Sequence, residues 1–160
     1  MTGKLASIVF KPESGGREPG LGYHRVPLRE ARLVVGHGIE GDAKGGKRKR
    51  QLNVVSSGVI EELGTEGFGT RPGQLGEQLV IDGVAVERLP IGTRLQIGAV
   101  ACIELLELRT GCSRFEKHHG RTKEEAAGRL GMMAAVTAAG AIQVGDVVEV
   151  LRDVNTVRLP

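Results

Sequence analysis

Aromatic residues are the scarcest class in this sequence. The chain has no Trp, and Phe and Tyr together make up 2% of its 160 residues, at Phe10, Tyr23, Phe68 and Phe115. Domains that bind single-stranded nucleic acid by stacking need repeated aromatic side chains, so this composition speaks against that class. Hydrophobic residues still make up 40% of the chain, which is enough for a core built from Val, Ile, Leu and Ala.

Cysteine and long apolar runs are also in short supply. The two cysteines, Cys102 and Cys112, are too few for a disulfide framework. No apolar run approaches the length of a membrane span, and the apolar stretch near the N-terminus is too short for a signal peptide. We therefore expect no membrane association, a reducing cytoplasmic location and, at this length, a single domain over residues 1–160.

Glycine is abundant, with 25 residues spread along the chain, which favours many short elements joined by tight turns. The opening strand predicted in "GKLASIVFKP" has Leu5, Ser7 and Val9 on one face and the residues between them on the other. Short helices are predicted after Ser56 or Ser57 and after Thr122, where "TKEE" has a capping-box pattern. Together, the short strands, the turns and the short helices predict a mainly β fold, a closed or partly open barrel with two or three short helices.

The segment 36–51, "GHGIEGDAKGGKRKRQ", combines glycines with a dense basic run. Three interpretations compete: a solvated or edge-protecting charge run, a nucleic-acid contact, and an anion pocket in which backbone N–H groups and cations hold a phosphate or oxyanion. The glycines favour the anion pocket over nucleic acid, and the Walker A spacing is absent. The cations of this run are Lys44, Lys47, Arg48, Lys49 and Arg50.

Asp42 follows Gly41 within this segment. An Asp in that position most often accepts a hydrogen bond from the backbone two residues on, so the pattern predicts a turn residue. A role in fixing a neighbouring cation is the alternative.

The two cysteines have different surroundings. Cys102 lies in "AVACIELLEL" and is predicted to be a buried, apolar strand residue. Cys112 follows Gly111 at a strand end, with cations nearby at Arg109 and Arg114; such a setting lowers the pKa of a thiol, and the thiolate is both a nucleophile and a soft metal ligand. An ordinary loop cysteine is the competing interpretation.

Two histidines follow Cys112 in the sequence. His118 and His119 are predicted to be surface residues. Nothing at short spacing completes a four-ligand zinc site.

Four segments, taken in order, resemble the MOSC domain, a module found at the C-terminus of molybdenum-cofactor sulfurases and as stand-alone bacterial proteins. They are "GIEGDAKGGKRKRQLNVVSSGVIEEL" (38–63), "RPGQLGEQLVIDG" (71–83), "LPIGTRLQIGAVACIELLELRTGC" (89–112) and "GRLGMMAAVTAAGAIQVGDVVEV" (128–150). The resemblance spans about residues 4–151 and rests on the ordered set of motifs.

The resemblance implies a β-barrel of the type also seen in pyruvate kinase. It implies that the defining cysteine of the family is Cys112, which carries persulfide sulfur or contacts molybdenum. The family's Gly-Asp falls on Gly41 and Asp42, its following basic residue on Arg50, and its Gly-Glu on Gly76 and Glu77. Pyridoxal phosphate is attached to the family only by general description.

The sequence departs from the family pattern at two positions. Lys44 stands where a His is frequent, and Gln78 stands where an Asn is frequent. A Lys can bind an anion but cannot ligate a metal while it is protonated. A barrel that has lost its activity is therefore one interpretation of this chain.

The leading hypothesis is a protein that binds molybdenum cofactor or carries sulfur, either as a molybdenum-cofactor-dependent oxidoreductase or as a sulfurtransferase-type protein. Its partners would be a small anionic cofactor or sulfur donor and a redox or sulfurtransferase protein. A non-catalytic module that binds anions or nucleic acid through residues 44–50 is the alternative. The residues assigned by the hypothesis are Cys112 as the reactive and metal-contacting thiolate, Lys44, Arg50 and Arg114 as anion-binding cations, and Asp42 and Glu77 as groups that orient them.

Overall fold

The structure is a computed structural model that describes residues 1–12, 25–47 and 51–151. Its helices are α1 (Ser57–Thr65) and α2 (Ser113–His119), with short 3₁₀ helices η1 (Val86–Arg88) and η2 (Lys123–Ala126). None of the helices in these ranges is long and apolar enough to cross a membrane. The strands are β1 (Thr2–Phe10), β2 (Val26–Leu28), β3 (Glu30–Val34), β4 (Gly38–Ile39), β5 (Leu52–Ser56), β6 (Leu79–Asp82), β7 (Arg94–Ile97), β8 (Ala101–Leu108), β9 (Met132–Ala138), β10 (Gly140–Gln143) and β11 (Val147–Leu151).

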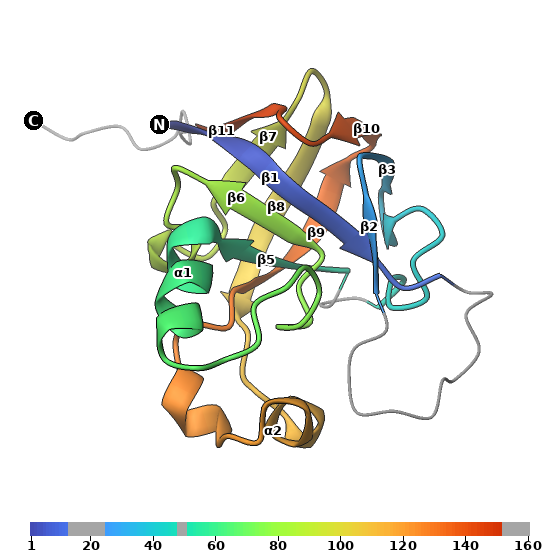
Figure 1. Ribbon diagram of the computed structural model, residues 1–160. Helices are drawn as coiled ribbons and strands as arrows, with labels where there is room; N and C mark the ends of the chain where they lie inside the picture. Colours follow the sequence, from blue (N-terminus) through green and yellow to red (C-terminus); the bar gives the residue numbers. More distant parts are fainter. Residues whose placement is uncertain (13–24, 48–50, 152–160) are drawn as a thin grey trace, which may run out of the picture.

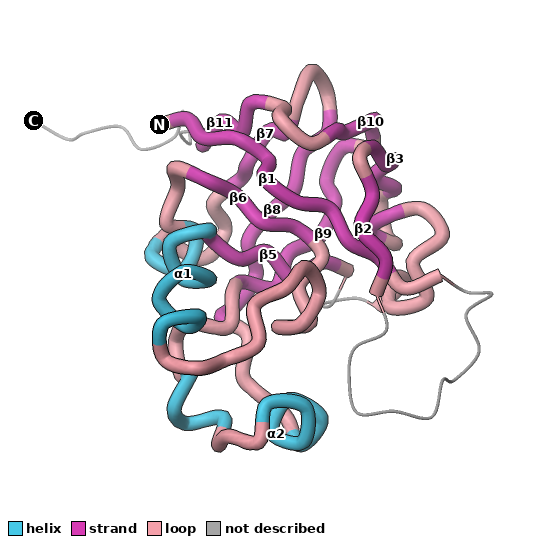
Figure 2. Tube along the Cα trace, viewed as in Figure 1, coloured by secondary structure: helices cyan, strands magenta, loops and turns pink. Residues whose placement is uncertain are grey.

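A closed barrel of seven strands confirms the predicted mainly β fold (Figure 1). The strands pair in the order β11-β7-β8-β9-β5-β6-β1, and an antiparallel pairing of β11 with β1 closes the ring. β5 and β6 pair in parallel, and the connection between them carries α1, since a parallel pair needs a crossover. A smaller sheet, β10-β3-β4, flanks the barrel, and Figure 2 shows both helices outside the strands.

The faces predicted for the first strand are wrong because β1 contains a bulge. The register against β6 shifts between Leu5 and Ser7, so Ala6 is an extra residue. The shift brings Leu5 and Ile8 to the same side, where both belong to the barrel core. Strict alternation had placed these two residues on opposite faces.

The prediction for Cys102 also needs correction. Along β8, the buried positions are Ala101, Ile103 and Leu105, which face the barrel core. Cys102 lies between them on the opposite, outward face and is only half-buried. The uniformly apolar sequence of the strand concealed which face is inward.

Both predicted helix starts are found, but neither is capped by its side chain. Ser56 precedes α1, and its backbone N–H and hydroxyl donate to the two carboxylate oxygens of Glu87, at 2.8 and 2.7 Å. Thr122 precedes η2, which is a short 3₁₀ helix without the predicted capping box. Ser56 therefore links the start of α1 to η1 through Glu87, and its side chain does not cap α1.

A second hydrophobic core, separate from the barrel, holds α2, an element that the sequence did not predict. α2 lies in the long connection at the shared end of β8 and β9, where Leu108 is opposite Met132. Phe115 of α2 is fully buried and stacks on Phe68, with ring centroids 6.0 Å apart. Two of the few aromatic residues are thus used to dock this helix. The buried members of the second core are Leu63, Phe68, Leu75, Phe115, Ala126 and Leu130.

His119 is part of this packing and is not the surface residue that the sequence predicted. Its ring lies 4.5 Å from that of Phe115, centroid to centroid. The backbone N–H of Gly69 donates to Nδ1 at 3.3 Å, so Nε2 carries the proton and donates to the Gln74 carbonyl at 2.9 Å. Burial, more than the nearby charges, lowers the pKa of His119 below its ordinary value.

Substitution of Phe115 tests the second core. Phe115→Ala should lower the free energy of unfolding by about 3–5 kcal/mol, because it leaves a cavity in a fully enclosed site. Urea denaturation measures this loss. Phe10→Ala, at a half-buried position against the barrel core, is the matched control and should cost less. A loss for Phe115→Ala no larger than that of the control would show that α2 is not anchored by this ring.

The neutral state of His119 predicts a dependence of stability on acid. Its folded pKa lies below the ordinary value of 6.5, so the unfolded chain takes up the proton first as the pH falls. The contribution of His119 to the free energy of unfolding is full above pH 6.5. It is lost as the pH falls from there through the folded pKa of His119. In urea denaturation at a series of pH values, His119→Gln should flatten this slope. His37→Gln, at the β3–β4 turn, is the control; an unchanged slope in His119→Gln would contradict the assignment.

Candidate functional site

The buried carboxylate of Asp42 organises one side of the site. Asp42 is fully inaccessible to solvent, and its Oδ1 accepts hydrogen bonds from the backbone N–H groups of Lys44 and Lys11, at 3.0 and 3.1 Å. The bond to Lys44 is the turn that the sequence predicted. The bond to Lys11 joins this turn to the chain just after β1, so one carboxylate holds two cationic residues at neighbouring backbone positions.

Gln78 links this turn to the opposite side of the site. Its side-chain Nε2 donates to Asp42 Oδ2 at 3.3 Å, and its Oε1 accepts the backbone N–H of Asn53 at 2.7 Å. The side-chain amide of Asn53 donates from Nδ2 to the backbone carbonyl of Leu130 at 3.1 Å. Gln78 therefore belongs to a buried polar chain that runs from the Asp42 turn to the residues just before β9.

Glu77 shapes the loop that precedes β6. Its carboxylate is 1% exposed and accepts the backbone N–H of Gly73 at 2.7 Å and that of Leu75 at 3.2 Å. Burial raises the pKa of Glu77, while the backbone N–H groups and Arg25 oppose the rise. Asp42 and Glu77 thus both accept hydrogen bonds from backbone N–H groups.

Two arginines pack against the Glu77 loop from different parts of the chain. A Cβ at Gly73 would lie 2.9 Å from Cβ of Arg25, and one at Gly76 would lie 2.8 Å from Nη2 of Arg109. Both glycines have positive φ, at 86° and 77°. Arg109 also donates from Nη1 to the carbonyl of Leu75. Positive φ favours glycine at both positions, and at Gly73 the Cβ of Arg25 also occupies the space that a side chain would need.

A cluster of five cations is the main electrostatic feature of the site. Lys44 is half-buried, and burial is the largest cause of its lowered pKa. Repulsion from Lys11, Arg114, Arg25 and Lys47 lowers the pKa of Lys44 further. These residues lie just after β1, just before β2, in or just after the Asp42 turn, and in α2. We call Lys11, Arg25, Lys44, Lys47 and Arg114 the cationic cluster.

Cys112 lies next to this cluster in the chain. It is exposed, it immediately precedes α2, and its carbonyl accepts the backbone N–H of Glu116 at 3.1 Å. Arg114, two residues further on, acts electrostatically on Lys44. The fold therefore lets the Arg114 side chain act on the charge of Lys44, which lies about 70 residues earlier in the sequence.

The structure brings only some of the predicted site residues together. Lys44 and Arg114 are brought into one cluster, and Arg50 lies outside the described residues. Sequence analysis missed Lys11 and Arg25, because each stands outside the dense basic run and only the fold brings it near. Gln78 was noted only as a departure from a pattern, although its neighbour Glu77 was already a candidate.

No resident metal site made of protein side chains is formed in the described part of the chain, where no three His, Cys, Asp or Glu side chains gather. Pyridoxal phosphate binding stays a prediction from the family description, since the described residues single out no separate arrangement for it.

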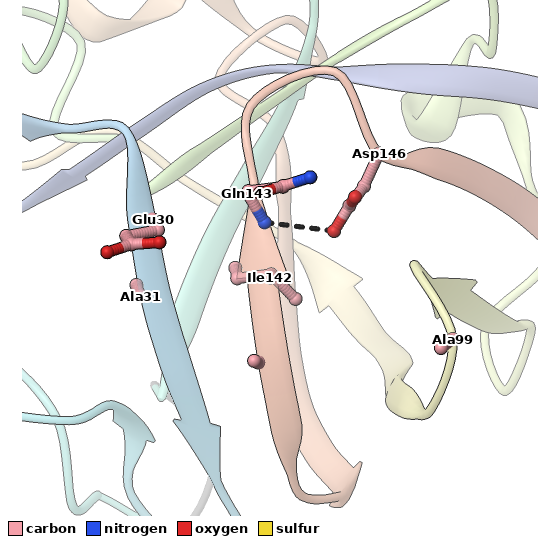
Figure 3. A pocket seen from close by; sticks show the side chains of 7 residues that line it. Glu30, Ala31, Ala99, Ile142, Gln143 and Asp146 are labelled. Carbon is pink, nitrogen blue, oxygen red and sulfur yellow. Dashed lines mark hydrogen bonds between the residues drawn. The ribbon is translucent and has the colours of Figure 1, made fainter.

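A cavity of about 490 Å³ lies elsewhere, between β3, β10 and the β7–β8 turn (Figure 3). Glu30 and Asp146 line it, and Asp146 Oδ2 accepts the backbone N–H of Gln143 at 2.9 Å. None of the predicted site residues borders this cavity. Its two carboxylates would repel an anion, so the cationic cluster is the better candidate for an anion site.

Comparison with solved structures shows the same fold in three bacterial proteins. The YuaD protein from Bacillus subtilis superposes with a TM-score of 0.74 and 20% identity, over 94% of this chain and 96% of that one. YiiM from Escherichia coli gives a TM-score of 0.69 with 18% identity, over 94% of this chain and 71% of that one. YiiM from Geobacillus stearothermophilus gives 0.71 with 15% identity, over 94% and 75%.

Among curated protein sequences there is no match. Comparison with protein families gives a match over residues 41–149 to the MOSC domain. The matched segment contains the Asp42 turn, the Glu77 loop and Cys112, and it covers more than half of the chain. The protein therefore belongs to the MOSC domain family.

Proposed function

We propose that the protein binds molybdenum cofactor, or carries sulfur as a persulfide, through Cys112 beside the cationic cluster. The observation that supports this proposal is that Arg114 acts electrostatically on Lys44. Arg114 is only two residues from the exposed thiol of Cys112, so the thiol and the cations are linked through it. The proposal thus combines a soft ligand with a set of cations at one end of the barrel.

The side chains that are present fit such a cofactor. Its phosphate is an anion, and the closely spaced cations of the cluster attract anions and gain from having their mutual repulsion screened. A thiolate is a soft ligand suited to a transition metal. Lys44, Arg114, Lys11 and Arg25 would hold the phosphate, and Cys112 would contact the metal. The bound cofactor would supply redox or sulfur-transfer chemistry at molybdenum.

Asp42, Glu77 and Gln78 act as positioning residues in this proposal. They are buried, and their polar atoms bind backbone N–H groups or one another. Their contribution is to keep the Asp42 turn and the Glu77 loop in place, so that the cations stay close in spite of their repulsion.

The sulfur-carrying form of the proposal uses the same thiol. The Cys112 thiolate attacks the terminal sulfur of a persulfide donor and forms a new sulfur–sulfur bond. The donor's own sulfur–sulfur bond breaks, and the donor leaves as a thiolate with the bonding electrons. An exposed sulfur is accessible to a donor protein, so the partner would be a sulfurtransferase or redox protein. A cytoplasmic location would keep this thiol reduced.

Lys44 limits the chemistry that we assign to this position. A half-buried amine among cations can hold an anion, but while protonated it donates hydrogen bonds and accepts none. We therefore propose anion binding for Lys44 and assign it no metal contact.

Measurement of bound metal and sulfur tests the proposed function. The wild-type chain, Cys112→Ala and Cys102→Ala would be expressed in a host that makes molybdenum cofactor. Molybdenum, pterin and cyanide-labile sulfur would then be measured per chain. We expect at least molybdenum with pterin, or labile sulfur, in the wild type. We expect a loss in Cys112→Ala and wild-type content in Cys102→Ala, whose thiol is on the outward face of β8.

Equal contents in Cys112→Ala and the wild type would contradict the proposal, as would a wild-type protein with none of the three.

The alternative function, nucleic-acid binding through residues 44–50, predicts a different result. Binding of single-stranded RNA would then weaken steeply with salt and would not change in Cys112→Ala.

A further inference from the structure

Lys44 and Lys11 are held close together by the backbone. Both backbone N–H groups donate to Asp42 Oδ1, and the N–H of Ala43 donates to the carbonyl of Lys11 at 2.8 Å. These bonds fix the two backbone segments side by side. The two ammonium groups can therefore move apart only by side-chain rotation, and Arg25, Arg114 and Lys47 add to the repulsion.

This arrangement favours the neutral form of one amine. Burial and the four neighbouring cations lower the pKa of Lys44 below its ordinary value. A larger fraction of Lys44 is then unprotonated near neutral pH than for a lysine in water, and only the unprotonated amine is a nucleophile.

The same cations attract anionic reagents. Charged sites of one sign raise the local concentration of ions of the opposite sign, and they stabilise a leaving group that departs as an anion. A reagent that combines negative charge with an electrophilic carbon would meet both conditions at Lys44. Acyl phosphates have both properties.

We propose that Lys44 is a preferred modification site for acyl phosphates, at which the cationic cluster binds the phosphate group while the amine takes the acyl group. The lone pair of Nζ attacks the carbonyl carbon, and the bond from that carbon to the phosphate oxygen breaks. Phosphate leaves with the bonding electrons, an amide forms, and the nitrogen releases one proton to solvent. No electron acceptor or donor is needed.

Acylation would also change the charge of the site. The amide is neutral and cannot regain a proton, so the cluster loses one of its cations and binds anions less tightly. This consequence rests on the proposed function, because it concerns the anion that the cluster holds. The acylation step itself does not depend on it.

The test compares lysines within the same wild-type protein. The full chain is treated with acetyl phosphate at neutral pH, and the extent of acetylation is followed by mass spectrometry of peptides. Lys4 on β1 and Lys123 on η2 are exposed and serve as internal controls. Lys44 should react faster than both by about tenfold or more, within the range by which charge can concentrate an ion.

Competition and substitution separate this mechanism from general reactivity. Inorganic phosphate should protect Lys44 and leave Lys4 and Lys123 unaffected. Arg114→Gln should reduce the preference for Lys44, whereas Arg88→Gln, an exposed arginine that is not among the cations acting on Lys44, should preserve it.

Two results would overturn the inference: acetylation of Lys44 no faster than that of Lys4 and Lys123, or equal protection of all three by phosphate. Wild-type protein that fails this test while Cys112 still binds molybdenum or sulfur would refute the acylation alone. Acetylated protein that binds phosphate as tightly as untreated protein would refute the charge effect and leave the acylation standing.

Discussion

Buried acceptors that bind backbone N–H groups hold the cationic cluster together. Cations in close proximity repel one another, and nothing in their own side chains keeps Lys44 near Lys11. The Asp42 carboxylate does so by binding the backbone of both residues, and Gln78 connects Asp42 to Asn53 in β5. Buried polar groups of this kind are costly to disturb, because removal of one partner leaves another without its hydrogen bond. The unfavourable charge arrangement at the surface therefore depends on a satisfied polar network beneath it.

The barrel alone does not place Cys112. The thiol precedes α2, and α2 is fixed by the second core, in which Phe115 packs on Phe68 and His119 binds backbone groups of the 69–74 segment. That segment leads into the Glu77 loop, against which Arg25 and Arg109 pack. The same loop therefore contacts α2, which begins just after Cys112, and Arg25, a member of the cationic cluster. In this way residues distant in sequence come to share one site.

Much of the fold could be predicted from the sequence, because short strands and turn residues leave local signals. The barrel, α1 and the Asp42 turn follow from such signals. The inward face of β1 could not be predicted, since the bulge at Ala6 depends on pairing with β6. α2 was missed because "SRFEKHH" has one fully buried residue, Phe115, and its stability comes from packing. Lys11 and Arg25 were missed because isolated cations leave no pattern, whereas Lys44 and Arg114 stood beside recognisable motifs.

The central claim is that the cationic cluster forms one anion site. The most direct test is calorimetric titration of the wild-type chain with inorganic phosphate at several salt concentrations. The account predicts saturable binding at one site that weakens with salt, weakens in Arg114→Gln and in Lys44→Gln, and is unchanged in Arg88→Gln. Absence of binding to the wild-type chain, or equal binding by all four proteins, would contradict it.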